Sequence, residues 1–119
     1  MSLHTKIKAT REGLNGQKTS TGWRINNIVP FVALPSFAAL RQRVNVTYKD
    51  KTVIALVMDV GPWNEEDDAY VFGDARPQAE SGKDLFDRIT NHAGIDLGEA
   101  VRIALGILAD NVEVDWEFV

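Results

Sequence analysis

Hydrophobic and polar positions along the chain alternate mainly with the period of a β-strand. The alternation is clearest in Arg43–Tyr48 and Val112–Phe118, where branched or aromatic residues occupy every second position. Residues 4–10 alternate more loosely. A period of two predicts strands with one buried face, so these three segments predict a mostly β protein.

Residues 53–58 form an unbroken apolar run, which predicts a strand buried on both faces. Asp59 follows the run, and a Gly-Pro pair, Trp63 and Asn64 come directly after it. Glycine and proline favour a turn, so we expect the strand to end here. A carboxylate beside an aromatic ring and an amide is a common set of carbohydrate-binding groups. The simpler interpretation is that Asp59 bonds only the N–H groups of its own turn.

The segments before this strand are shorter. The polar connection 49–51 predicts a hairpin that joins Arg43–Tyr48 to the apolar run. Residues 25–34 predict another strand, which the interior Pro30 limits to an edge or a bulged position. Residues 37–40 predict a short helical turn capped by Ser36.

One helix is predicted just before the last strand. Its apolar residues recur at helical spacing from Leu97 to Leu105, and Gly106 is the expected C-terminal stop. Asp96 is a candidate N-cap, and Glu99 completes a capping box with it. A structural role as a helix cap is therefore the simpler interpretation of Asp96.

A long acidic loop is predicted between the central strand and this helix. Residues 65–68 are four consecutive acids, whose mutual repulsion favours a solvated segment. They lack the alternating spacing of a calcium loop, so we predict no metal site. Residues 70–87 are polar, and a helical turn is predicted at 84–89.

Composition narrows the possible partners. The chain of 119 residues suits a single domain over 1–119, and its net charge of −4 argues against nucleic acid and anionic membranes as partners. It has no cysteine, which excludes disulfides and thiolate metal sites. We see neither a membrane-spanning segment nor a signal peptide in this chain, and nothing in it points to a cofactor.

Four motifs occur in a recognisable order, and a Val-rich last strand follows them. They are the Lys-Thr-Ser-Thr-Gly corner at 18–22, the Arg-Val-Asn-Val strand at 43–46, Asp59 with its Gly-Pro-Trp turn, and Ile-Asp-Leu at 95–97 before an Ala-rich helix. This order resembles the double-psi β-barrel domain of the rare lipoprotein A family and, more distantly, barwin, expansins and small inverting endoglucanases. The resemblance implies a six-stranded double-psi β-barrel.

The resemblance also implies a function. Rare lipoprotein A proteins are cell-envelope or secreted proteins that bind the glycan strands of peptidoglycan, and some cleave them as lytic transglycosylases. Asp59 and Asp96 match the aspartates of two family motifs, which makes Asp59 the candidate general acid/base and Asp96 its support. We expect burial to raise the pKa of Asp59 and the helix N-terminus to keep Asp96 ionised.

Departures from the family pattern leave two alternatives open. Trp23 replaces a glutamate of the family, and Val60 replaces an arginine. Residues 31–36, which match a histidine-containing stretch of the family, have no histidine, and His92 is beside the Ile-Asp-Leu motif instead. One alternative is a non-catalytic module that binds polysaccharide. Its aromatic and polar contacts with sugar would come from Trp23, Trp63, Tyr70, Asn64 and Thr19. The other is a structural or interaction domain that has lost the chemistry of the groove.

Overall fold

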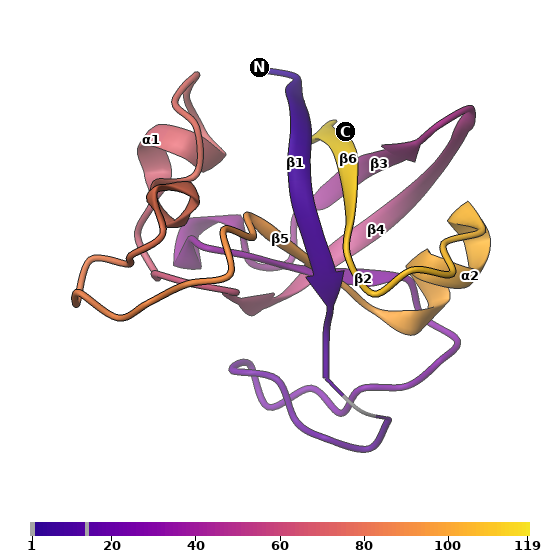
Figure 1. Ribbon diagram of the computed structural model, residues 1–119. Coiled ribbons are helices and arrows are strands. Elements are labelled where there is room, and N and C mark those ends of the chain that lie inside the picture. The colour runs from indigo at the N-terminus through magenta and orange to yellow at the C-terminus, as the bar shows by residue number, and fades with distance from the viewer. Residues whose placement is uncertain (1, 14) are drawn as a thin grey trace.

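The structure is a computed structural model that describes residues 2–13 and 15–119, and it forms a closed barrel of six strands (Figure 1). Leu14, in the connection that follows the first strand, lies outside the described residues. The elements are β1 (His4–Arg11), β2 (Phe31–Leu34), a 3-10 turn (Phe37–Ala39), β3 (Arg43–Tyr48), β4 (Lys51–Val60), α1 (Asp68–Val71), a second 3-10 turn (Gln78–Ser81), β5 (Ile95–Leu97), α2 (Glu99–Leu105) and β6 (Val112–Phe118). The predicted mostly β barrel, with a helix before its last strand, is confirmed.

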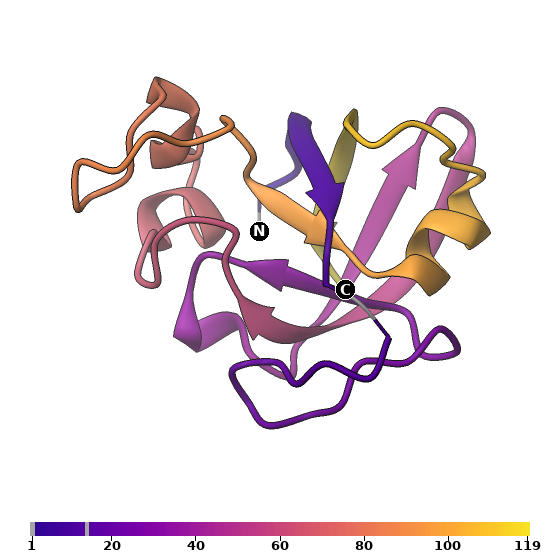
Figure 2. The same ribbon diagram turned by 60° about the horizontal axis from the view of Figure 1, so that its bottom comes forward.

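Strands distant in sequence are neighbours in the barrel. Its order is β1-β5-β2-β4-β3-β6, with parallel pairing between β1 and β5 and between β2 and β4. Two long connections join strands that are not neighbours in the barrel: residues 12–30 link β1 to β2, and residues 61–94 link β4 to β5. The connection 12–30 runs across one end of the barrel in Figure 2. The connection 61–94, called the excursion below, lies on the side opposite α2 in both views.

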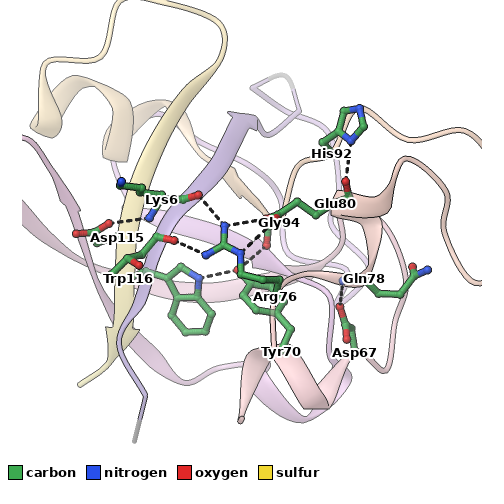
Figure 3. Close-up of polar contacts among 11 residues, drawn as sticks. Lys6, Asp67, Tyr70, Arg76, Gln78, Glu80, His92, Gly94, Asp115 and Trp116 are labelled. Carbon is green, nitrogen blue, oxygen red and sulfur yellow. Dashed lines mark hydrogen bonds and ion pairs between the residues drawn. The ribbon is translucent and has the colours of Figure 1, made fainter. Parts of the chain in front are cut away.

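The excursion is anchored in the core by an aromatic cluster. Tyr70 is fully buried, and its hydroxyl accepts a hydrogen bond from Trp116 Nε1 at 2.7 Å and donates one to the Gly94 carbonyl at 3.0 Å (Figure 3). The His4 ring stacks on Trp116 with 4.2 Å between ring centroids. Because β1, β6 and the excursion all contribute to this cluster, the predicted loop is a packed part of the domain.

A guanidinium group joins the excursion to β1. Arg76 donates to the carbonyls of Thr5 and Lys6 at 2.6 and 2.9 Å, and it pairs with Glu80 at 2.8 Å (Figure 3). The pairing of β1 with β6 shifts register between His4 and Ile7. Arg76 therefore satisfies carbonyl groups where the regular ladder is interrupted.

The predicted start of the helix is wrong. Asp96 lies in β5, where it pairs with Thr10 and Ala33, and the N-cap of α2 is Gly98. Sheet pairing therefore takes precedence over the capping box that the sequence suggests. The predicted stop is confirmed, since Gly106 adopts a left-handed conformation with φ of 70°.

Three strand and turn predictions also need correction. Ile54 on β4 is 51% exposed, so this strand is not buried on both faces. Of the predicted strand at 25–34, only Phe31–Leu34 pairs, so Pro30 lies before the strand. This strand is between β4 and β5 and not at an edge, and the bulge at its register shift is on β4 and not on β2. Residues 84–89 form a non-helical turn, while the hairpin of β3 and β4 is confirmed.

The buried hydroxyl of Tyr70 gives a stability prediction. We expect Tyr70→Phe to lower the free energy of unfolding by about 1–3 kcal/mol, because it leaves two buried groups without a partner. Urea denaturation measures the change. Tyr48→Phe, at a half-buried position on β3, is the control and should lower the free energy of unfolding much less. An equal decrease in the two variants would contradict this role for Tyr70.

Candidate active site

The sheet register places the two aspartates that were predicted to be catalytic on either side of one small residue. Ala33 on β2 pairs with Asp59 on β4 and with Asp96 on β5. Residues in register on neighbouring strands project from the same face. Adjacent strands are about 4.8 Å apart, so the two aspartate backbones are separated by about 10 Å. The space above Ala33 can therefore receive side chains from both.

A β-bulge sets this register. Val32 pairs with Val57, but the next residue, Ala33, pairs with Asp59, so Met58 is the additional residue on β4. Without the bulge, Ala33 would pair with Met58. The Met58 carbonyl accepts a hydrogen bond from Thr21 Oγ1 at 3.2 Å. The hydroxyl-rich corner at 18–22 thus lies against the bulge that positions Asp59.

Asp59 is bound to backbone N–H groups from two segments. Its Oδ1 accepts from Val60 N at 2.8 Å, within its own turn, and from Ser20 N at 2.9 Å. The simpler interpretation, in which Asp59 bonds only its own turn, is therefore wrong. Burial acts to raise the pKa of Asp59, but hydrogen bonds from Glu12, Ser20 and Val60 outweigh it and lower the pKa. Asp59 is therefore ionised at neutral pH, contrary to the expectation that burial would protonate it.

A third carboxyl group, which the sequence analysis missed, completes the site. Burial raises the pKa of Glu12 to about 10, together with its hydrogen bond to Asp59 and the charge of Asp96. Glu12 is thus protonated at neutral pH and is a hydrogen-bond donor to the Asp59 carboxylate. One sequence signal was available: Glu12 is two residues beyond Thr10, so it extends the face of β1 that meets Asp96.

Asp96 also differs from the expectation. Burial raises its pKa, although hydrogen bonds from Thr10 and Glu12 act in the opposite direction. Thr10 Oγ1 donates directly to Asp96 Oδ1. The helix N-terminus does not set this pKa, because Asp96 lies in β5 and Gly98 caps α2.

A cleft gives access to Glu12. Its volume is about 280 Å³, and it is lined by Arg11, Glu12, Gly13, Asn15, Ile25, Asn27 and Glu99. The Asn15 and Asn27 amides are suited to bonding sugar hydroxyls, while Arg11 and Glu99 form an ion pair at 3.4 Å. A larger hollow of about 440 Å³ is lined by Asn64, Glu65, Phe86 and Arg88 and contains none of the three clustered carboxyls.

Two predicted sugar-binding residues lie in the connection that holds Asp59. Thr19 is 7% exposed, and its Oγ1 is 2.8 Å from Thr21 Oγ1. Trp23 is half-buried and contacts Phe31 edge-on, with 4.9 Å between ring centroids. The Thr19 hydroxyl therefore stabilises the loop by bonding Thr21, whereas part of the Trp23 ring is exposed to solvent.

The other predicted sugar contacts lie on the excursion. Asn64 is 5% exposed and uses its amide to bond Gln78 and the Leu85 N–H, and Tyr70 is fully buried. Neither side chain is available to a polysaccharide, so these two predictions are wrong. Trp63 is half-buried, and its Nε1 donates to Asn91 Oδ1 at 2.8 Å. His92 bonds the Glu80 carbonyl at 2.9 Å (Figure 3).

Two of the four acids at residues 65–68 accept hydrogen bonds from the rest of the protein, and the other two are exposed to solvent. Asp67 accepts a hydrogen bond from Gln78 N at 2.8 Å, and Asp68 accepts one from Ser36 Oγ at 2.6 Å, whereas the side chains of Glu65 and Glu66 face solvent. Within residues 2–13 and 15–119, no group of acids or histidines could hold a metal ion. In the same part of the chain, no helix is both long enough and apolar enough to cross a membrane.

The protonated Glu12 makes stability depend on pH. Its pKa is raised from 4.5 to about 10, so the folded state holds a proton that the unfolded chain releases in this range, and the free energy of unfolding falls as pH rises through it. We expect Glu12→Gln to match wild type near pH 4 and to exceed it by about 1 kcal/mol or more near pH 8.

Urea denaturation across this pH range measures the difference, with Glu66→Gln at an exposed site as the control. A constant difference between wild type and Glu12→Gln at all pH values would show that Glu12 is ionised in the folded protein.

Three comparisons relate the chain to known proteins. The structure is similar to that of Streptomyces papain inhibitor (SPI), with a TM-score of 0.62 and 20% identity over 99% of this chain and 94% of that one. This similarity shows a shared fold. No curated protein matches the chain. A protein-family model described as a domain of unknown function (DUF8814) matches residues 3–117, and the chain therefore belongs to this family.

Proposed function

We propose that the chain cleaves glycan strands, in the manner of a lytic transglycosylase, at the cluster of Glu12, Asp59 and Asp96. The supporting observation is one carboxyl group with a strongly raised pKa in contact with another whose pKa is lowered. Cleavage of a glycosidic bond needs a proton donor and an anion that stabilises an oxocarbenium-like centre. Glu12 and Asp59 have these two properties at neutral pH.

The reaction can proceed with one acid that also serves as the base. Glu12 donates its proton to the leaving oxygen as the bond from that oxygen to the anomeric carbon breaks. A hydroxyl of the same sugar then attacks the anomeric carbon and gives its proton to the Glu12 carboxylate. The product is an anhydro sugar, and Glu12 regains its proton without the addition of water.

Asp59 and Asp96 have different parts in this mechanism. The Asp59 carboxylate is held by two backbone N–H groups, so it remains ionised while positive charge develops on the sugar. Asp96, held by Thr10, keeps the local charge negative and favours the protonated form of Glu12. The Asp59 and Asp96 positions are those that resemble rare lipoprotein A motifs. Trp23 stands in place of the family glutamate, and in this proposal the third carboxyl group comes from Glu12 instead.

The partner in this proposal is the glycan of peptidoglycan, and the place of action is the cell envelope or the exterior. The cleft beside Glu12 offers the Asn15 and Asn27 amides to sugar hydroxyls. Glu65 and Glu66 are on the excursion and not among the residues that line this cleft, so their charges do not border the bound strand there.

The test is digestion of purified peptidoglycan, with products identified by mass. We expect anhydro-ended fragments from wild type and a loss of rate of about 10²–10⁴ in Glu12→Gln, as for removal of a general acid. Asp59→Asn should also lose most of its turnover. Glu99→Gln changes a carboxyl that lines the same cleft outside the cluster, and it should retain activity within a few fold.

The products also distinguish the alternatives. Reducing ends in place of anhydro ends would indicate a hydrolase that activates water. Full activity in Glu12→Gln would remove this residue from the mechanism. The absence of any product from wild type, on peptidoglycan with and without its stem peptides, would contradict cleavage altogether.

A second candidate function is non-catalytic binding of polysaccharide. It is favoured by Trp23, which is held against Phe31 and remains partly exposed next to the corner that binds Asp59. A fixed aromatic ring can stack on a sugar at little entropic cost. In this case wild type and Asp59→Asn should both pellet with peptidoglycan without cleaving it, and Trp23→Leu should pellet several fold less. Equal pelleting of Trp23→Leu would contradict this role.

A further inference from the structure

Residues 84–89 form a turn whose backbone is held by a buried carboxylate. Asp84 Oδ1 accepts hydrogen bonds from the N–H groups of Phe86 and Arg88, both at 2.9 Å, and Asp84 Oδ2 accepts one from Arg88 Nε at 2.6 Å. The Asp84 side chain is fully buried. The turn is therefore a defined structure, although it lies outside the barrel.

The turn is also fixed to the segment that follows β4. The Leu85 N–H donates to Asn64 Oδ1 at 2.9 Å, and the other end of the Asn64 amide donates to Gln78 Oε1 at 2.8 Å. Asn64 thus has its side chain buried between two parts of the excursion. The relative position of residues 64–66 and the turn is set by these bonds.

The turn exposes large apolar side chains. Leu85 is 64% exposed, Phe86 is 74% exposed and Ile89 is 81% exposed. Exposed apolar residues that are grouped together mark interaction surfaces more often than isolated ones do. Because the backbone is already ordered, binding through these side chains would cost little conformational entropy.

Two adjoining hollows lie between the turn and the acidic run, and together they form what we call the 64–86 groove. Their volumes are about 440 and 240 Å³, and Asn64, Glu65 and Phe86 line both. Leu85 and Glu66 complete the smaller hollow, and Arg88 completes the larger one. The groove therefore has apolar walls and a charged rim.

The net charge of the rim is negative. Arg88 is neutralised by Asp84 at 2.6 Å, and Lys83 is paired with Asp87 at 3.1 Å. Among the described residues, no ion pair includes Glu65 or Glu66. Two uncompensated carboxylates therefore border an apolar surface.

We propose that the 64–86 groove binds a segment of a partner protein that carries apolar residues flanked by lysine or arginine. An apolar side chain of the partner packs against Leu85 and Phe86, and its basic residues face Glu65 and Glu66. Complementary charge favours this partner over an acidic segment and over an anionic membrane. The groove is separate from the cleft at Glu12, so this interaction does not depend on the proposed glycan cleavage.

The probe is a fluorescein-labelled amphipathic peptide of leucine and lysine, titrated with the protein and followed by anisotropy. We expect Phe86→Ser to weaken binding about tenfold or more, as expected for an aromatic anchor. The double variant Glu65→Gln, Glu66→Gln should weaken binding at low salt and remove most of its salt dependence. Amide chemical shifts should change at residues 64–66 and 84–89 when the peptide binds.

Leu108→Ser is the matched control variant, because Leu108 is 95% exposed and does not line the groove. It follows α2 in the chain, and α2 lies on the side of the molecule opposite the excursion (Figure 1). This variant should bind the peptide like wild type. A peptide with glutamate in place of lysine should not bind. Absence of binding by wild type, or equal weakening by Leu108→Ser, would overturn the proposal.

Two other occupants would also overturn it. Dimerisation of wild type, abolished by Phe86→Ser in sedimentation experiments, would assign the groove to a second copy of the chain. Co-sedimentation with phosphatidylcholine vesicles, lost in the same variant, would assign the turn to a lipid surface.

Discussion

The burial of three carboxyl groups in mutual contact, those of Glu12, Asp59 and Asp96, is the physical constraint on which the chemistry of this barrel depends. Partly buried carboxyl groups in mutual contact cannot all be ionised, because each charge raises the energy of the others. The two backbone N–H groups that bind Asp59 determine which group keeps its charge. The proton is therefore held by Glu12, whose pKa burial raises to about 10, together with its hydrogen bond to Asp59 and the charge of Asp96.

The rest of the fold provides the rigidity that this cluster requires. A β-bulge at Met58 brings Asp59 into register with Ala33, and the parallel pairing of β1 and β5 brings Asp96 into register with Thr10. The excursion leaves the barrel immediately after this bulged strand, and Tyr70 returns it to the core beside Trp116. Packing distant from the site thus offsets the free-energy cost of burying charge within the site. Functional sites are commonly stabilised in this way by the surrounding structure.

The sequence predicted the barrel because its strands have regular periodicity and its motifs occur in a familiar order. Asp59 was a candidate because it follows the apolar run 53–58, whereas Asp96 was a candidate only because it matches a family motif. The sequence could not predict their pKa shifts, which depend on contacts with Glu12 and with the Ser20 N–H, both distant in sequence. Glu12 was missed because it stands at the start of a glycine-containing loop, where a charged residue is ordinarily solvated. Tyr70 and Asn64 were assigned to sugar binding because residue type alone does not reveal burial.

The most direct measurement is a ¹³C NMR titration of the side-chain carboxyl carbons of Glu12, Asp59 and Asp96. Residue-specific assignment would come from Glu12→Gln, Asp59→Asn and Asp96→Asn. We expect Glu12 to remain protonated through neutral pH and Asp59 to titrate below its ordinary range. If Glu12 titrates near 4.5 and all three groups are ionised at neutral pH, the proton donor that the mechanism requires does not exist.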